Sequence, residues 1–190
     1  MEPLFPLQPK YPGGFVYAPN FLTTDEEETL LDVILRIPLR TFLFHGYEAK
    51  RKVVSFGYDY SFDQRSISKG REIPSEFQWL IKKVNDFSGG NNNFAELLIT
   101  EYPVGSVINW HRDAPPFETI AGISLLSDCV FRFRPYDKTR RRRKSIISLE
   151  TKRRSLYILS GESRSEWEHS ILPVAATRYS ITLRTLKVSQ

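Results

Sequence analysis

The sequence predicts an α+β fold, mainly β, in which two N-terminal helices pack on a strand-rich second half. Two amphipathic helical segments precede residue 90, and after residue 93 short runs rich in Ile, Leu, Tyr, Phe and Thr alternate with turn residues. Such a half closes as a sandwich, a jelly roll or a small barrel. The length of 190 residues predicts one domain, over 1–190, with its own core.

The helical segments lie in the first half. Residues 1–15 are rich in Pro and Gly and are expected to lie extended over the surface. In TTDEEETLLDVILRI (23–37), Thr24 and Glu27 indicate a capping box, and Pro38 ends the helix. PSEFQWLIKKVNDFSGG (74–90) predicts a second helix with one apolar face, made of Phe77, Leu80, Ile81 and Val84.

The strands are expected in the second half, within 94–102, 121–136, 145–161 and 178–188. In the second run Val130, Arg132 and Arg134 alternate with Phe131 and Phe133. Because side chains on a strand alternate between two faces, this run predicts one polar and one apolar face.

Composition limits the location and the kinds of site. A single cysteine, Cys129, excludes an internal disulfide and a cysteine-rich zinc site. No apolar run reaches the roughly 18 residues of a membrane span, and the N-terminus lacks a secretory pattern. We therefore expect a cytoplasmic protein with no membrane partner.

Positive charge is concentrated in KTRRRRK (138–144). This run carries six positive side chains, so the net charge of +5 leaves 5 − 6 = −1 for the remainder. A local basic cluster suits contact with a polyanion, and a solvated hairpin tip would account for it equally well.

A His-x-Asp pair stands in INWHRDAPP (108–116). On a strand, His111 and Asp113 share a face. With His169 they make the two-histidine, one-carboxylate ligand set that favours Fe(II) and leaves coordination positions open. His45 has no acidic neighbour and is expected at a turn or an edge. Such a short motif also arises by chance, and a structural histidine would explain His111 alone.

The last run carries two arginines, Arg178 and Arg184, six positions apart with Ser180 and Thr182 between them. The even interval places them on one face of a strand. If that face is buried, the arginines need anions, and a dicarboxylate would satisfy both. A solvent-facing strand explains the same alternation.

WHRD, WEHSILP and RYSITLR together resemble the AlkB-like branch of the Fe(II)/2-oxoglutarate-dependent dioxygenases. Upstream, LLITEYPVGSVINWHRD resembles the family's strand and turn before the metal pair, and GYDYS (57–61) its substrate lid. The resemblance covers most of 15–190 and is densest over 98–184. It implies a double-stranded β-helix, a form of jelly roll. Residues 15–93 would supply the helices and lid segment, and 94–190 the catalytic β core.

The resemblance implies residue roles. Fe(II) would be held by His111, Asp113 and His169, with no catalytic residue beyond the iron centre. The co-substrate 2-oxoglutarate would be bound by a second group, whose members are Tyr102, Arg178, Arg184, Thr100 and Ser180. Arg178 is expected at the distal carboxylate and Arg184 nearer the metal, an order that sequence leaves open. The family often has Asn where Thr100 and Ser180 stand, so these contacts are expected to be looser or bridged by water.

The resemblance also implies the substrate class, alkylated DNA or RNA. The reaction would consume O2 and 2-oxoglutarate and release formaldehyde, succinate and CO2. It would serve DNA repair or another demethylation of nucleic acid. We expect the protein to be a monomer. The candidate substrate-binding residues are Tyr58, Tyr60, Arg51 and Trp110, and Trp110 also fits a plain core aromatic. The segment APP after the metal pair departs from some DNA-repair members. Oxidation of a protein or small molecule on the same scaffold, and a non-catalytic nucleic-acid-binding module, are the alternatives.

Overall fold

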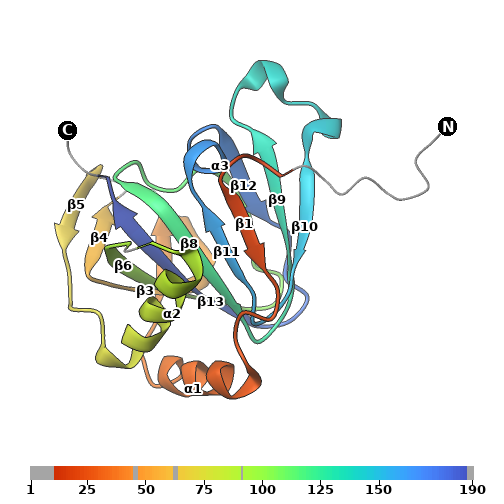
Figure 1. Ribbon diagram of the computed structural model, residues 1–190. Helices are drawn as coiled ribbons and strands as arrows, with labels where there is room; N and C mark the ends of the chain where they lie inside the picture. The colour runs from red at the N-terminus through yellow and green to blue at the C-terminus, as the bar shows by residue number, and fades with distance from the viewer. Residues whose placement is uncertain (1–10, 45–46, 62–63, 91, 188–190) are drawn as a thin grey trace.

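The computed structural model describes residues 11–44, 47–61, 64–90 and 92–187. Two antiparallel sheets face each other in the two-layered arrangement of a jelly roll (Figure 1). The larger sheet has the strand order β1-β11-β8-β13-β6-β3-β2, and the smaller has β10-β9-β12-β7. A separate hairpin, β4-β5, lies beside the larger sheet.

The elements have the following bounds. The strands of the larger sheet are β1 Phe15–Ala18, β2 Arg40–Phe44, β3 Tyr47–Phe56, β6 Phe94–Tyr102, β8 Phe117–Leu125, β11 Leu156–Leu159 and β13 Arg178–Leu186. Those of the smaller sheet are β7 Ile108–His111, β9 Cys129–Pro135, β10 Ile147–Thr151 and β12 Trp167–Ile171, and the hairpin is β4 Tyr58–Ser61 and β5 Ser66–Lys69. The α-helices are α1 Thr24–Ile34, α2 Gln78–Ser88 and α3 Gly161–Ser165, and the 3-10 turns are η1 Ser75–Phe77, η2 Lys138–Arg140 and η3 Arg143–Ser145.

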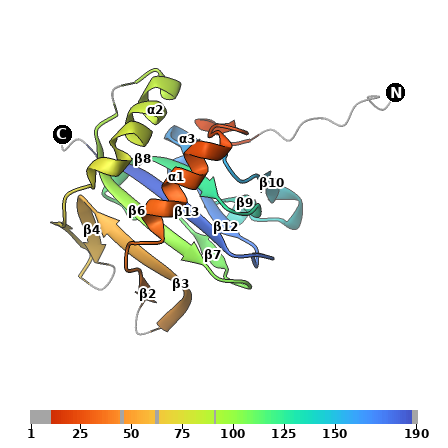
Figure 2. The ribbon, with the colours of Figure 1, turned by 90° about the horizontal axis from the view of Figure 1, so that it is seen from below.

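The two long helices cover one face of the larger sheet (Figure 2). Apolar side chains of the central strands, such as Leu97, Ile99, Ile181 and Leu183, point toward this layer and are fully buried. Burial of this size is the main favourable contribution to folding, so this face holds the principal core.

The opposite face of the larger sheet looks toward the smaller sheet. Tyr102, Ile120 and Tyr157 from the larger sheet form a second apolar cluster with Phe131 and Phe133 from the smaller. The side chains of β9 alternate as predicted, with Phe131 and Phe133 buried and the arginines on the outer side. The space between the sheets is thus only partly filled by apolar groups.

Helix α1 begins one residue earlier than the sequence pattern indicates, so the predicted cap is wrong. Thr23 is the N-cap: its hydroxyl accepts from the Glu26 backbone N at 3.2 Å, and Glu26 returns a contact to the Thr23 N at 2.8 Å. Glu27 is instead fully buried and accepts from Arg153 and from the Leu126 backbone N. Its carboxylate therefore ties the helix to two loops of the β core.

The predicted second helix is present as α2, preceded by the 3-10 turn of residues 75–77, and Ile81 of its predicted apolar face is half-buried. Phe77, Leu80 and Val84 are buried, and Gly89 ends the helix with a φ of 65°, a left-handed conformation that glycine tolerates best. The predicted strand runs hold β6, β9, β10, β11, β13 and the end of β8, while β12 lies outside them. Strand β6 covers the expected 94–102. The helix of residues 161–165 was not predicted, because five residues are too few for helical periodicity to show.

The first half contributes more strand than the sequence predicted. Strands β1 and β3 pair with β11 and β6, so segments 15–93 and 94–190 share one sheet. The predicted architecture, two helices packed on a C-terminal β half, is therefore incomplete. The extent of the single domain, 1–190, stays a prediction. The expected positions of residues 1–10 and of His45 fall outside the described residues. Within them, no helix is both long and apolar enough to cross a membrane.

Candidate metal centre and substrate cavity

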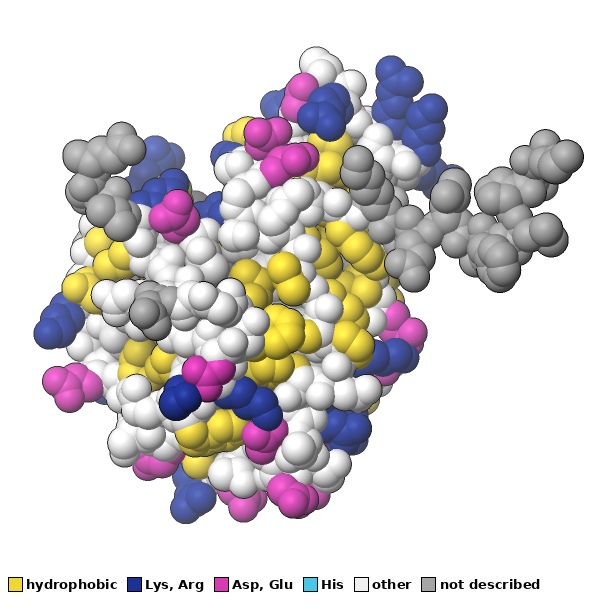
Figure 3. All heavy atoms as spheres, viewed as in Figure 1, with side chains coloured by type: hydrophobic (Ala, Val, Ile, Leu, Met, Phe, Trp, Pro, Cys, Tyr) yellow, Lys and Arg dark blue, Asp and Glu magenta, His cyan; other side chains and the backbone are white. Residues whose placement is uncertain are grey.

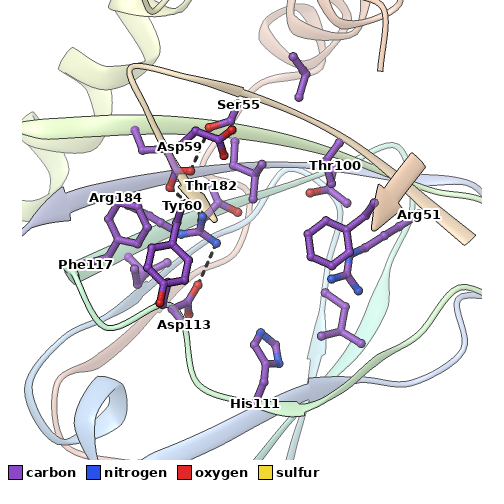
Figure 4. A pocket seen from close by; sticks show the side chains of 18 of the residues that line it. Arg51, Ser55, Asp59, Tyr60, Thr100, His111, Asp113, Phe117, Thr182 and Arg184 are labelled. Atoms are coloured by element: carbon purple, nitrogen blue, oxygen red, sulfur yellow. Dashed lines mark hydrogen bonds and ion pairs between the residues drawn. The ribbon is translucent and has the colours of Figure 1, made fainter. Parts of the chain in front are cut away.

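A cavity of about 680 Å³ opens between the two sheets. Its walls come from both sheets and from the β4-β5 hairpin, and Figure 4 shows His111, Asp113 and Arg184 pointing into it. Cavities of this volume lie within the range of small-molecule binding sites.

Register places the two candidate histidines side by side. His111 ends β7 and is directly opposite His169 on β12, with ring centroids 4.3 Å apart. Asp113 follows two residues later, and its Oδ2 lies 3.5 Å from Nε2 of His169. The three predicted iron ligands are thus neighbours at one end of the cavity.

The loop that carries Asp113 is held from outside the cavity. Arg164 of α3 donates from one nitrogen to the carbonyls of Asp113, Ala114 and Phe117 at 3.1, 2.8 and 2.9 Å. These bonds restrict the backbone just where the carboxylate must be positioned.

The protonation states suit metal binding. Burial lowers the pKa of His169 to about 3, with the neighbouring His111 acting in the same direction, and burial likewise lowers the pKa of His111. Burial alone would raise the pKa of Asp113, but Arg184 and the histidines hold it below its ordinary value. Neutral imidazoles and an ionised carboxylate are the forms that bind a metal.

The His111 ring presents the appropriate nitrogen. Its Nδ1 lies 2.8 Å from the Asn109 carbonyl oxygen, which only accepts, so Nδ1 carries the proton and the Nε2 lone pair is free. As the side chains stand, no three His, Cys, Asp or Glu groups within the described ranges are already gathered as a metal site. The ligand set therefore stays a prediction.

Buried polar atoms without hydrogen-bond partners indicate that these residues fit Fe(II) and 2-oxoglutarate. Asp113 Oδ2, Arg178 Nη1 and Arg184 Nε are buried without hydrogen-bond partners among the described residues. Buried polar atoms are rarely left unpaired, and each such exception calls for an explanation. A cation at Asp113 and carboxylates at the two arginines would satisfy all three.

Arg184 is held by two carboxylates. Its Nη2 donates to Asp113 Oδ1 at 2.9 Å and its Nη1 to Glu96 Oε2 at 2.7 Å (Figure 4). Glu96 is 2% exposed and also accepts from Ser55 at 3.0 Å. Sequence reasoning missed Glu96, although its place on the same face of β6 as Thr100 and Tyr102 was a usable signal. The pairing fixes Arg184 and leaves Oδ2 of Asp113 directed to His169.

Arg178 occupies the other end of the same face. It is 1% exposed, lies 4.8 Å from the Tyr102 ring centroid and donates to Ser124 at 3.0 Å. The hydroxyl oxygens of Tyr102 and Ser180 are 3.4 Å apart, and Thr100 is the register partner of Ser180 on the neighbouring strand β6. Both arginine side chains are thus on the buried face, and the solvent-facing alternative is excluded. Arg178 is not among the residues that line the cavity, while Arg184 lines it beside Asp113.

The four candidate substrate residues divide into two pairs. Tyr60 and Arg51 line the cavity, and Arg51 lies over the Phe42 ring at 4.1 Å. Tyr58 and Trp110 are not among the lining residues. Trp110 lies on the outer side of the smaller sheet, where the guanidinium carbons of Arg132 and Arg134 are 4.7 and 4.6 Å from its ring centroid.

Further arginines around the cavity were not predicted from the sequence. Arg40, Arg71 and Arg112 contribute to its lining together with Arg51. They come from β2, from the residues after β5 and from the loop after β7, so no run of sequence reveals them. With Arg184 they make five arginines against three lining carboxylates, those of Asp59, Glu96 and Asp113, so positive charge is in excess on the cavity wall.

The comparisons with known proteins agree with this geometry. The model of the 2OG-Fe(II) oxygenase superfamily matches residues 14–184. The chain belongs to this superfamily, and relatives named as ALKBH8 proteins agree with the resemblance to the AlkB-like branch. The enzyme class predicted from the sequence, a 2-oxoglutarate-dependent dioxygenase that uses Fe(II), is thereby confirmed at the level of the family.

Two relatives illustrate the similarity. A protein of Arabidopsis thaliana named "Alkylated DNA repair protein ALKBH8 homolog" is 31% identical over 182 residues, covering 84% of this chain and 51% of the relative. The Xenopus tropicalis "tRNA (carboxymethyluridine(34)-5-O)-methyltransferase alkbh8" is 27% identical over 176 residues, covering 88% of this chain and 26% of the relative. The chain thus spans about half of one relative and a quarter of the other.

Solved structures confirm the jelly-roll fold. "The structure of OsALKBH1" matches with a TM-score of 0.67 at 16% identity, covering 95% of this chain and all of that one. A prolyl hydroxylase from Trichoplax adhaerens, bound to a hypoxia inducible factor peptide, matches with a TM-score of 0.62 at 15% identity, covering 91% and 83%. At these identities the likeness concerns the fold alone.

Proposed function

We propose that this chain oxidises alkylated bases of nucleic acid in an Fe(II)- and 2-oxoglutarate-dependent reaction. On an N-methyl group the outcome is demethylation, with release of formaldehyde, succinate and CO2. The observation that carries the proposal is a single cavity that joins the His111, Asp113 and His169 cluster to an arginine-lined wall bearing Tyr60 and Phe42.

The metal end would be organised by the chain as follows. His111 and His169 offer neutral ring nitrogens, and Asp113 offers the oxygen that Arg184 leaves free. When bound, Fe(II) with 2-oxoglutarate and O2 supplies the oxidation of an unreactive C–H bond. The protein contributes by orienting the participants and keeping water from the reacting atoms.

The co-substrate would lie along the polar face of β6 and β13. Arg178, with an unpaired and buried nitrogen, would receive the distal carboxylate, beside Tyr102, Thr100 and Ser180. Arg184, at the Asp113 end, would meet the carboxylate nearer the metal. The guanidinium groups of Arg178 and Arg184, held at the two ends of this strand face, would favour a short diacid.

The substrate end suits a base that has left its stack. Enzymes that act on bases extrude the target nucleotide into a pocket and hold it between rings. Tyr60 and Phe42 supply rings here, and Arg40, Arg51, Arg71 and Arg112 supply positive charge for phosphates. These contacts support nucleic acid over a small uncharged substrate.

The names of the relatives divide between repair of alkylated DNA and a tRNA methyltransferase. The second candidate substrate is therefore a modified base of tRNA, which the same cavity and cofactors could hydroxylate. Hydroxylation at a carbon that is not bound to nitrogen or oxygen releases no formaldehyde. A cytoplasmic location and a monomeric state remain predictions of the sequence.

The deciding experiment is a substrate panel with succinate and formaldehyde measured in parallel. N-methylated single-stranded DNA, N-methylated RNA, bulk tRNA and a proline-containing peptide are each incubated with Fe(II) and 2-oxoglutarate, and His111→Ala serves as the inactive control. Both products from a methylated strand support demethylation, and succinate without formaldehyde from tRNA supports the second candidate. Stimulation by the peptide alone would reject nucleic acid as the substrate.

A further inference from the structure

The basic run of residues 138–144 forms a folded lobe between β9 and β10. Two 3-10 turns shape it: the Asp137 carboxylate accepts from the Thr139 backbone N at 2.8 Å, and the Ser145 hydroxyl donates to the Arg140 carbonyl at 3.0 Å. Arg141 donates to the Tyr136 carbonyl at 2.8 Å and pairs with Glu168 at 3.2 Å. The lobe thus has a defined conformation, with Arg141 as its internal tie.

The remaining charges of the lobe point outward. Segment 132–144 contains eight positive side chains and one negative. Arg140, Arg142, Arg143 and Lys144 are exposed and form no ion pair with any residue that the structure describes. Figure 3 shows Lys and Arg side chains gathered on this lobe above β9 and β10. Like charges held this close repel one another, and a polyanion relieves that repulsion.

One aromatic ring, that of Tyr136, connects the lobe to the cavity. Tyr136, at the base of the lobe, is 47% exposed, and Arg112 lies over its ring at 3.5 Å, with Arg141 at 5.8 Å. Arg112 also lines the cavity. Arg112, the Tyr136 ring and Arg141 therefore connect the cavity wall to the base of the lobe.

We propose that Arg112, Tyr136 and the basic lobe of residues 138–144 form a docking surface for the phosphodiester backbone of a nucleic-acid strand. The inference rests on the proposed function, since the docked strand is the one whose base enters the cavity. Guanidinium groups beside an exposed ring suit a chain of alternating phosphates and bases better than an acidic peptide, which offers charge without stacking surface. Because the contacts are to phosphate, the surface binds RNA and DNA alike.

The test compares two double variants of the full chain. Arg142→Gln/Arg143→Gln removes two exposed charges from the lobe and leaves its tie, Arg141, intact. Arg36→Gln/Lys82→Gln removes two exposed charges from the helical layer and is the matched control. Binding to a labelled, unmodified single-stranded RNA and to DNA of the same sequence is measured by fluorescence anisotropy over a range of salt concentrations. Thermal unfolding verifies that both variants fold.

We expect the lobe variant to bind both strands roughly tenfold more weakly, and its log–log salt slope to be shallower by about 1.4, for two lost phosphate contacts. The control should bind as the wild type does. Wild-type binding retained by the lobe variant would overturn the docking surface and leave the proposed function intact. Absence of binding by the wild type would overturn both. Equal displacement of either strand by polyglutamate would show an unspecific polyanion surface and also reject the inference.

Discussion

The two faces of the larger sheet are built by the same strands and have different roles. On the face toward the helices, β6 and β13 present Leu97, Ile99, Ile181 and Leu183, all fully buried. On the face toward the cavity the same strands present a polar set, comprising Glu96, Thr100, Tyr102, Arg178, Ser180, Thr182 and Arg184. The apolar face contributes stability, and the polar face keeps buried charges in fixed positions where they can act on a ligand.

Burial alone does not distinguish a core residue from a site residue on this sheet. Arg178 is as buried as Ile181, three positions away. An isolated buried arginine is costly, because it loses its hydration and needs a partner. The cavity face is therefore less stable than an apolar face would be, and substitutions on the two faces should have opposite consequences for stability and for activity.

The largest effect is expected for Asp113→Ala. This change removes the only predicted carboxylate ligand, so Fe(II)-dependent succinate production should fall below detection. Arg184 keeps its pair with Glu96 at 2.7 Å, and the midpoint of denaturant unfolding should change little. Succinate release and urea unfolding are measured on the same preparation. Residual turnover close to that of the wild type would show that Asp113 is not a ligand.

The converse is expected for Leu183→Ala, one residue from Arg184 on the other face. Leu183 is fully buried, so its truncation should lower the free energy of unfolding by about 2–5 kcal/mol. The affinity of the folded fraction for 2-oxoglutarate should be unchanged below the melting transition. Urea unfolding and ligand titration monitored by tryptophan fluorescence check the two parts. A stable variant with weakened affinity would contradict the separation of the faces.

A smaller effect is expected for Glu96→Gln, which keeps the shape of the side chain and removes its charge. Glu96 positions Arg184, and the loss of such support behind a metal ligand typically reduces activity or affinity about 10- to 100-fold. We expect the 2-oxoglutarate concentration for half-maximal turnover to rise while maximal turnover falls less. Ser55→Ala, which removes the other partner of Glu96, is the matched control and should shift this concentration only slightly. Equal losses in both parameters would argue for a general structural role.

The smallest effect concerns the helical layer. Thr23→Ala should lower the free energy of unfolding by about 1 kcal/mol, because it removes the N-cap of α1. Thr24→Ala should have a smaller effect, since the Thr24 hydroxyl accepts an exposed hydrogen bond from Arg154 at 3.3 Å and caps no backbone N–H among the described residues. Thermal unfolding of the two variants provides the measurement, and a larger loss for Thr24→Ala would reverse the cap assignment.

Much of the site could be predicted because its signals are local. The even interval between Arg178 and Arg184 gave their common face, and His-x-Asp gave the pair that ends β7. The same alternation would have placed Trp110 opposite His111, and its prediction as a substrate residue neglected this rule. Glu96 was missed because its partner lies 88 positions away in the sequence. Strands β1 and β3 were missed because their partners β11 and β6 lie in the second half, and the other strands before residue 70 are short hairpin strands that pair with near neighbours.

The sequence by itself determined the two long helices, the main strands, the common face of Arg178 and Arg184 and the family, since each depends on periodicity or on residues close together in the chain. The burial of that face was decided by the structure. Only the tertiary structure decided which carboxylates hold Arg184, which residue caps α1 and which arginines line the cavity. These choices depend on contacts between distant segments. Such contacts leave no period in the sequence, because they join segments that come together only in the folded chain.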